Sequence, residues 1–159
     1  RVELLVPDLQ GNHEALSTIL MAKPAIFGHN LETVPRLYPL ARAGADYQRS
    51  LNLLAAAAQA APDIPTKSGL MLGMGETMGE IPTVMQDLQK AGCRMLTLGQ
   101  YLQPTRHHLP VVRYVEPSEF SSLRDIGLQL GFAHVEAGPL VRSSYHAAEQ
   151  FEGDSDEQP

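Results

Sequence analysis

Short apolar runs alternate with longer amphipathic segments along most of this chain, and that alternation constrains the fold more than any other feature. The apolar runs have the length of strands, while the segments between them have helical spacing. Strands that alternate with helices form largely parallel sheets with the helices outside. We therefore predict an α/β fold with about five parallel strands.

The predicted strands cover residues 2–6, 25–28, 68–72, 95–98 and 133–136, and the predicted helices cover residues 12–21, 46–60, 80–90 and 117–130. Asp46 is expected to cap the second helix by accepting a backbone N–H. Gly92 and Gly131 follow the third and fourth helices, where a left-handed residue is needed. Pro117 fits the first turn of the fourth helix.

The composition is that of one globular domain. The 159 residues are 43% hydrophobic and 19% charged, enough to bury one core. The net charge of -6 and the scattered Lys and Arg residues argue against nucleic-acid binding. No run approaches the roughly 20 apolar residues of a membrane span. We expect one domain over residues 1–148 and an acidic, disordered tail over residues 149–159.

Cys93 is the only cysteine of the chain. It excludes an internal disulfide, and alone it cannot hold a zinc ion or an iron–sulfur cluster. A reducing compartment is expected. The sequence opens at Arg1, without methionine and directly before a strand-like run, so we expect it to be part of a longer protein.

Unusual polar side chains follow each predicted strand. They are Asp8, Gln10 and Asn12; His29, Asn30 and Glu32; Glu76 and Thr77; Gln100, Tyr101 and Gln103; and Arg142, Ser143, Ser144, Tyr145 and His146. The carboxyl ends of parallel strands share one edge of the sheet, where ligands bind in barrels and open sheets alike. We predict a shared site at this edge.

The glycines of residues 69–76 (GLMLGMGE) permit tight turns and close approach of backbone to a flat ligand. A loop that only needs positive φ angles is an equal alternative. Lys67 precedes the glycines, which argues against a phosphate-binding loop. An apolar strand end with exposed backbone suits an adenine ring better.

His29, Asn30 and Glu32 offer an imidazole, an amide and a carboxylate within four residues. Such groups can bond the diol of a ribose, although a lone histidine is more often structural. Asp8 is expected to cap the helix that begins near Asn12.

His107 and His108 are adjacent, so their side chains point apart, and we expect them to lie at the surface or to face a partner. Around Ser143, a serine that caps a terminal helix would explain one residue but not the neighbouring arginine and tyrosine.

Five stretches closely resemble lipoyl synthases of the radical S-adenosylmethionine superfamily. They are residues 2–8 (VELLVPD), 29–36 (HNLETVPR), 66–77 (TKSGLMLGMGET), 98–105 (LGQYLQPT) and 138–145 (GPLVRSSY). The resemblance covers nearly the whole chain up to about Ala148. It implies the C-terminal part of a partial βα barrel whose loops surround S-adenosylmethionine.

The resemblance also implies roles for single residues. The cofactor-binding residues would be Asn30, Glu32, Gly69, Met71, Gly73, Glu76, Gln100 and Tyr101. Met71 stands where the superfamily's adenine-side motif usually has isoleucine. Ser144 would supply an oxygen ligand to an auxiliary four-iron cluster, and the choice between Ser143 and Ser144 rests on the family pattern. His29 and Arg142 would contact substrate.

In that family, an electron from a first 4Fe–4S cluster cleaves S-adenosylmethionine to a 5′-deoxyadenosyl radical. The radical removes hydrogen from C6 and C8 of an octanoyl group on a carrier lysine, and an auxiliary 4Fe–4S cluster donates sulfur to each carbon. The carriers implied are the E2 subunits of 2-oxoacid dehydrogenases and the H protein of glycine cleavage. The implied compartment is the cytoplasm, or the mitochondrion or plastid for a eukaryotic parent.

The chain departs from the family in lacking the two cysteine triplets that hold the clusters. We therefore expect the isolated chain to be inactive as a sulfurtransferase. A stand-alone βα domain that binds a nucleotide or an acyl-carrier partner without catalysis is the alternative. Arg36, Arg42 and Arg49 are expected either to steer an acidic carrier or to form a solvated helix face.

Overall fold

The computed structural model of the chain describes residues 2–143. Its strands are β1 (Glu3–Leu5), β2 (Ile26–Gly28), β3 (Thr66–Leu72), β4 (Met95–Gln100) and β5 (His134–Gly138). Its helices are α1 (His13–Met21), α2 (Tyr38–Ala41), α3 (Tyr47–Ala60), α4 (Glu80–Lys90) and α5 (Pro117–Gln129), with 3-10 turns at η1 (Leu9–Gly11) and η2 (Pro35–Leu37). The α/β fold predicted from the sequence is confirmed.

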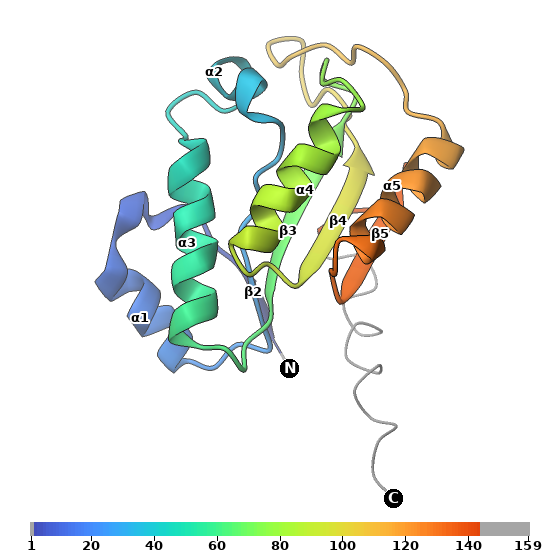
Figure 1. The fold of residues 1–159 in the computed structure, drawn as a ribbon. Coiled ribbons are helices and arrows are strands. Elements are labelled where there is room, and N and C mark those ends of the chain that lie inside the picture. Colours follow the sequence, from blue (N-terminus) through green and yellow to red (C-terminus); the bar gives the residue numbers. More distant parts are fainter. Residues whose placement is uncertain (1, 144–159) are drawn as a thin grey trace, which may run out of the picture.

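All five strands are parallel, and their order in the sheet is their order in the sequence, β1-β2-β3-β4-β5. Connections between parallel strands are right-handed, so consecutive order places every crossover helix on the same face. Figure 1 shows α3, α4 and α5 over that face of the sheet. This arrangement is consistent with a partial βα barrel.

The main core lies between the sheet and these helices. Leu70, Leu72, Leu96 and Leu98 of the two central strands are buried against apolar side chains of α4 and α5. The α4 and α5 side chains of this layer are Ile81, Val84, Met85, Leu88, Phe120 and Leu123. A smaller cluster joins α1 and α3 to β2. Burial of these side chains holds the strands, and therefore their carboxyl ends, in fixed positions.

Several predicted helix ends are confirmed. Asp46 caps α3 by accepting a hydrogen bond from the backbone N–H of Arg49 at 2.6 Å. Gly92 and Gly131 have φ angles of 77° and 98°, as required of residues that end helices. Pro117 begins α5.

The predicted role of Asp8 is wrong. Asn12 caps α1, because its Oδ1 accepts hydrogen bonds from the N–H groups of Glu14 and Ala15 at 3.0 Å. Asp8 instead accepts from Gln10 at the start of the short turn η1. Its second carboxylate oxygen pairs with Arg49 of α3.

Some elements differ in length from their prediction. β3 begins two residues earlier than expected, at Thr66, and β4 continues to Gln100. Residues 35–41, for which no element is predicted from the sequence, form η2 and α2. Both are too short for a helical period to be visible in the sequence. No helix within residues 2–143 is long and apolar enough to cross a membrane.

Candidate functional site

The face of the sheet opposite the helices carries the candidate site. Side chains alternate along a strand, so Leu70 and Leu72 of β3 point into the helix layer while Gly69 and Met71 point away from it. Gly69 is paired with Thr97, and Met71 with Gly99. Glycine at positions 69 and 99 lets the Asn30 side chain and the segment after β5 lie close against this inner face.

A cavity of about 290 Å³ lies over these glycines. Its walls are Leu5, Asn30, Glu32, Gly69, Leu70, Met71, Thr97, Gly99, Val141, Arg142 and Ser143. Residues in or directly after all five strands contribute to it. The polar clusters of β2 and β5 therefore do meet at one edge, as the sequence predicts.

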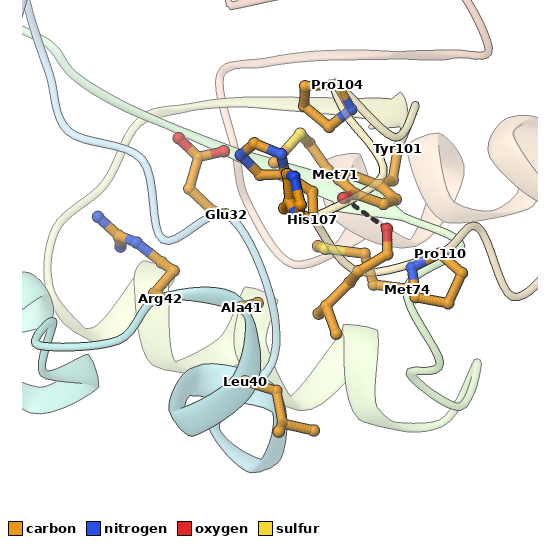
Figure 2. A pocket seen from close by; sticks show the side chains of 12 residues that line it. Glu32, Leu40, Ala41, Arg42, Met71, Met74, Tyr101, Pro104, His107 and Pro110 are labelled. Atoms are coloured by element: carbon orange, nitrogen blue, oxygen red, sulfur yellow. Dashed lines mark hydrogen bonds between the residues drawn. The ribbon is translucent and has the colours of Figure 1, made fainter.

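A second, larger cavity of about 500 Å³ adjoins the first. Both cavities are lined by Glu32 and Met71, which form the boundary between them. Figure 2 shows Glu32, Met71, Tyr101 and His107 among the side chains that line the larger cavity. The Tyr101 hydroxyl donates a hydrogen bond to the carbonyl of Leu109 at 2.9 Å, which fixes the ring.

The turn after β2 is what brings Asn30 and Glu32 to the cavities. Glu32 has a φ of 67°, a left-handed conformation that is unfavourable for a residue with a side chain. Its backbone N–H donates to the carbonyl of Gly69, and its carbonyl accepts from Met71. These two bonds dock the turn on β3 and hold the strained residue in place.

The Glu32 carboxylate is largely removed from solvent, and this burial raises its pKa. A hydrogen bond from the Asn30 side chain and the nearby charge of Arg42 act in the opposite direction. The carboxylate therefore lies at the boundary of the two cavities with Asn30 as a hydrogen-bond partner and Arg42 as a nearby charge.

A charged contact holds the segment after β5 against the inner face. The ammonium group of Lys67, 2% exposed, donates to the carbonyl of Ser143 at 2.6 Å and pairs with Glu3 at 3.0 Å. A Cβ at Gly99 would collide with the carbonyl oxygen of Val141, so this segment passes directly over β4. Arg142 and Ser143 reach the smaller cavity by this route.

Gly73, Glu76 and Gln100 have structural partners in the described part of the chain and line neither cavity. The Glu76 carboxylate accepts hydrogen bonds from the N–H groups of Gly73 and Met74 at 2.5 and 3.0 Å. The Gln100 amide donates to the carbonyls of Tyr101 and Arg113 and accepts from Val115. These contacts shape the loops after β3 and β4.

His29, directly after β2, is 1% exposed and lines neither cavity. Its Nδ1 lies 2.9 Å from the carbonyl oxygen of Val6, which can only accept, so Nδ1 carries the proton. Within residues 2–143, Nε2 has no hydrogen-bond partner. Burial lowers the pKa of His29 and keeps the ring neutral.

Arg42 and Thr97 each line a cavity, although neither is among the residues predicted for this site. The alternating pattern of β4 was the available signal for Thr97, a polar residue between two buried leucines. Arg42 carried no such signal. His107 and His108 are exposed, as expected, at the rim of the larger cavity.

The three arginines of the proposed steering patch have separate local partners. Arg36 forms a two-pronged pair with Glu80 at 2.9 and 3.0 Å. Arg49 pairs with Asp8, and Arg42 donates to backbone carbonyls after β2. The Arg36 side chain is 55% exposed, while Arg42 and Arg49 are half-buried.

No group of three or more histidine, cysteine or acidic side chains in residues 2–143 is placed to hold a metal ion. Cys93 is buried, and its thiol contacts the carbonyls of Met95 and Thr66. Burial raises its pKa to about 12, so the thiolate that iron requires is disfavoured. Ser144 lies outside the described residues, as does the predicted tail.

The fold and the two cavities define a parallel α/β protein with its ligand site at the carboxyl ends of the strands, as in βα barrels. No family model matches the chain. The chain is 63% identical over 147 residues to the lipoyl synthase of Trichlorobacter lovleyi, covering 92% of this chain and 52% of that protein. It is 60% identical over 151 residues to the lipoyl synthase of Acidithiobacillus ferrooxidans, covering 94% and 48%, and 59% identical over 152 residues to that of Geobacter sp. strain M21, covering 96% and 52%.

Over nearly its whole length, the chain is therefore similar to lipoyl synthases. It spans about half the length of the curated relatives that it matches, which is consistent with the expected C-terminal portion.

Proposed function

We propose that this chain is the part of a lipoyl synthase that orients S-adenosylmethionine and the octanoyl chain while two sulfur atoms are inserted at C6 and C8 of a protein-bound octanoyl group. The observation that carries the proposal is the meeting of two cavities at Glu32 and Met71, with walls from the carboxyl ends of the strands. The identity to lipoyl synthases supports the same family of reactions.

The residues present fit S-adenosylmethionine. The two cavities fall within or near the roughly 300–1,000 Å³ of small-molecule sites. Asn30 and Glu32 supply an amide and a carboxylate for the ribose and the methionine moiety. Gly69 leaves room for the Asn30 side chain in the wall of the smaller cavity, and Met71 and Tyr101 offer apolar contacts to the adenine ring.

When bound, S-adenosylmethionine supplies the radical chemistry, and the chain's own residues bind and orient the reacting groups. Arg142, at the wall of the smaller cavity, is the residue that we propose to contact the substrate. His29 is buried beneath the turn after β2, and its burial supports an indirect role through that turn. Gly73, Glu76 and Gln100 are proposed to act by shaping the loops that carry the cofactor contacts.

The iron–sulfur clusters do not fit the residues of this chain taken alone. One buried cysteine supplies no cluster, and we derive no step from one. Ser144 as an oxygen ligand remains a proposal that rests on the family pattern. The octanoylated carriers, the E2 subunits and the glycine-cleavage H protein, and a cytoplasmic location are proposed on the same basis.

The test uses the full-length protein that contains this chain, with iron and sulfide reconstituted and an octanoylated H protein as substrate. Mass spectrometry of the carrier should show two added sulfur atoms, and the Glu32→Gln variant should convert at least about tenfold less, since a charged hydrogen-bond partner is lost. Failure of the full-length protein to modify either class of carrier would overturn the proposal.

The second experiment of this test uses the isolated chain. After the same reconstitution it should hold no four-iron cluster and convert no octanoyl carrier, because its ligand set is incomplete. A full cluster for each chain, measured by iron content and by absorbance, would contradict this. Nucleotide binding by a chain whose full-length parent is inactive would instead favour the non-catalytic domain.

A further inference from the structure

The turn after β2 is held in place by a pair of side chains that have no role in the proposed function. The Nη1 of Arg42 donates to the carbonyls of Asn30 and Leu31 at 3.0 and 3.3 Å. The Tyr38 hydroxyl donates to the same Leu31 carbonyl at 2.8 Å. These carbonyls immediately precede Glu32.

Arg42 and Tyr38 also bind each other. Nη1 of Arg42 lies 3.2 Å from the Tyr38 hydroxyl, and the guanidinium carbon lies 5.4 Å from the centre of the Tyr38 ring. The ring of Tyr47 packs edge-on against Tyr38 at 5.4 Å. The pair is thus fixed by α2 and α3 and is not free to follow the turn.

Such a support is needed because Glu32 is in a left-handed conformation. For a residue with a side chain this costs about 1–2 kcal/mol, and it persists only where neighbours over-determine it. In addition to the two backbone bonds between Glu32 and β3, the N–H of Leu31 donates a hydrogen bond to Ser68 Oγ of β3 at 3.2 Å. The turn is therefore held by β3 on one side and by Arg42 and Tyr38 on the other.

We propose that Arg42 and Tyr38 are positioning residues that hold the turn of residues 30–32 so that the Glu32 carboxylate faces the boundary between the two cavities. The proposal rests on the proposed function, because it takes the ligand at Glu32 to be S-adenosylmethionine. The proposal gives Arg42 a role in the site that Arg36 and Arg49 do not share. It also gives α2 a role in the site.

The test measures the dissociation constant of S-adenosylhomocysteine, a non-reactive analogue, by calorimetry on the full-length protein. Arg42→Met should weaken binding about tenfold, as expected for loss of charged hydrogen bonds. Tyr38→Phe should weaken it about three- to fivefold, because the ring stays and one hydrogen bond is lost. Arg124→Met, the same substitution on the exposed face of α5, should leave it unchanged.

Arg42 also lines the larger cavity, so a direct contact with the ligand must be distinguished from positioning. In a Glu32→Gln background, Arg42→Met should have a much smaller effect than in the wild type, because both changes act on the same group. A direct contact would give additive effects and would overturn the proposal.

Hydrogen exchange provides a readout independent of binding. The amides of Leu31, Glu32 and Thr33 should exchange faster in the Arg42→Met and Tyr38→Phe proteins without ligand, while amides of β4 should not change. Wild-type exchange and wild-type affinity in both variants would contradict the positioning role. Absence of analogue binding by the wild type, with faster exchange in the variants, would contradict the proposed function and leave the support of the turn intact.

Discussion

The ammonium group of Lys67 lies 2.6 Å from the carbonyl oxygen of Ser143, so a buried lysine at the start of β3 holds the chain that follows β5. Glu3 of β1 balances the charge at 3.0 Å. A single residue therefore joins three separate segments on the inner face of the sheet.

Replacing Lys67 by methionine keeps the length of the side chain and removes its charge. The free energy of unfolding should fall by about 3 kcal/mol, because Glu3 loses its partner in a partly buried position. Urea denaturation measures this. Lys90→Met is the matched control, since its ion pair with Asp87 is exposed and 3.7 Å long, and it should cost less than about 1 kcal/mol. Equal losses in the two variants would show that the Lys67 contact is not stabilising.

Gly69 is close enough to Asn30 that a methyl group has no room. A Cβ at Gly69 would lie 2.8 Å from Thr97 Oγ1 and 2.9 Å from Asn30 Oδ1. Gly69→Ala should displace the Asn30 amide, reduce the affinity for S-adenosylhomocysteine about tenfold and cost about 1–3 kcal/mol of stability. Calorimetry and thermal unfolding of the variant would show both effects.

Gly79 provides the comparison, since a Cβ there meets nothing within 4 Å. Gly79→Ala should retain wild-type affinity. If Gly69→Ala does so as well, the amide of Asn30 is not a ligand contact.

The Glu80 carboxylate should make stability depend on pH in strongly acidic solution. Hydrogen bonds from Arg36 and from the backbone N–H of Thr77 lower its pKa from 4.5 to about 2. A carboxyl whose pKa is lower in the folded state stabilises the fold above its unfolded pKa, and the contribution disappears as pH falls from about 4.5 to about 2. Melting temperatures across this range should fall less steeply for Glu80→Gln than for the wild type. A slope unchanged by the substitution would argue against the pair.

His29 should make the stability of the fold depend on pH in a less acidic range than Glu80 does. Burial lowers its pKa below 6.5, so the unfolded chain takes up a proton more readily than the folded one. Stability is unaffected by this group above about pH 6.5 and decreases as pH falls from there through the folded pKa. His29→Gln should flatten the decrease in unfolding free energy between about pH 6.5 and the folded pKa of His29. A decrease as steep in the variant as in the wild type would be incompatible with a neutral, buried His29.

Local patterns in the sequence were sufficient for the positions of the five strands and of the long helices along the chain. The cap at Asp46 and the glycines after α4 and α5 act through neighbours within a few residues. The sequence therefore predicts these helix ends correctly. Asp8 was misassigned because two nearby residues, Asp8 and Asn12, both suit a cap. Only the geometry of η1 decided between them.

The site was predictable to the extent that strand ends could be located. Asn30, Glu32, Gly69 and Met71 do share one cavity, because parallel strands in sequential order bring their carboxyl ends to one edge. Gly73 and Glu76 follow β3, and Gln100 is the last residue of β4. Their backbone or side-chain groups nevertheless make hydrogen bonds within the loops after these strands. A polar residue at a strand end can face a cavity or bond its own loop, and spacing does not distinguish the two.

The sequence by itself determined the alternation of strands and helices, the edge at which polar residues gather and the relation to lipoyl synthases, because each depends on local periodicity or on residue identity. The tertiary structure alone decided that Arg42 and Tyr38 support the Glu32 turn and that Lys67 reaches Ser143. These contacts join residues whose distance depends on how α2 and the segment after β5 pack on the sheet. No sequence period encodes such packing, since it follows from the combined burial of several elements at once.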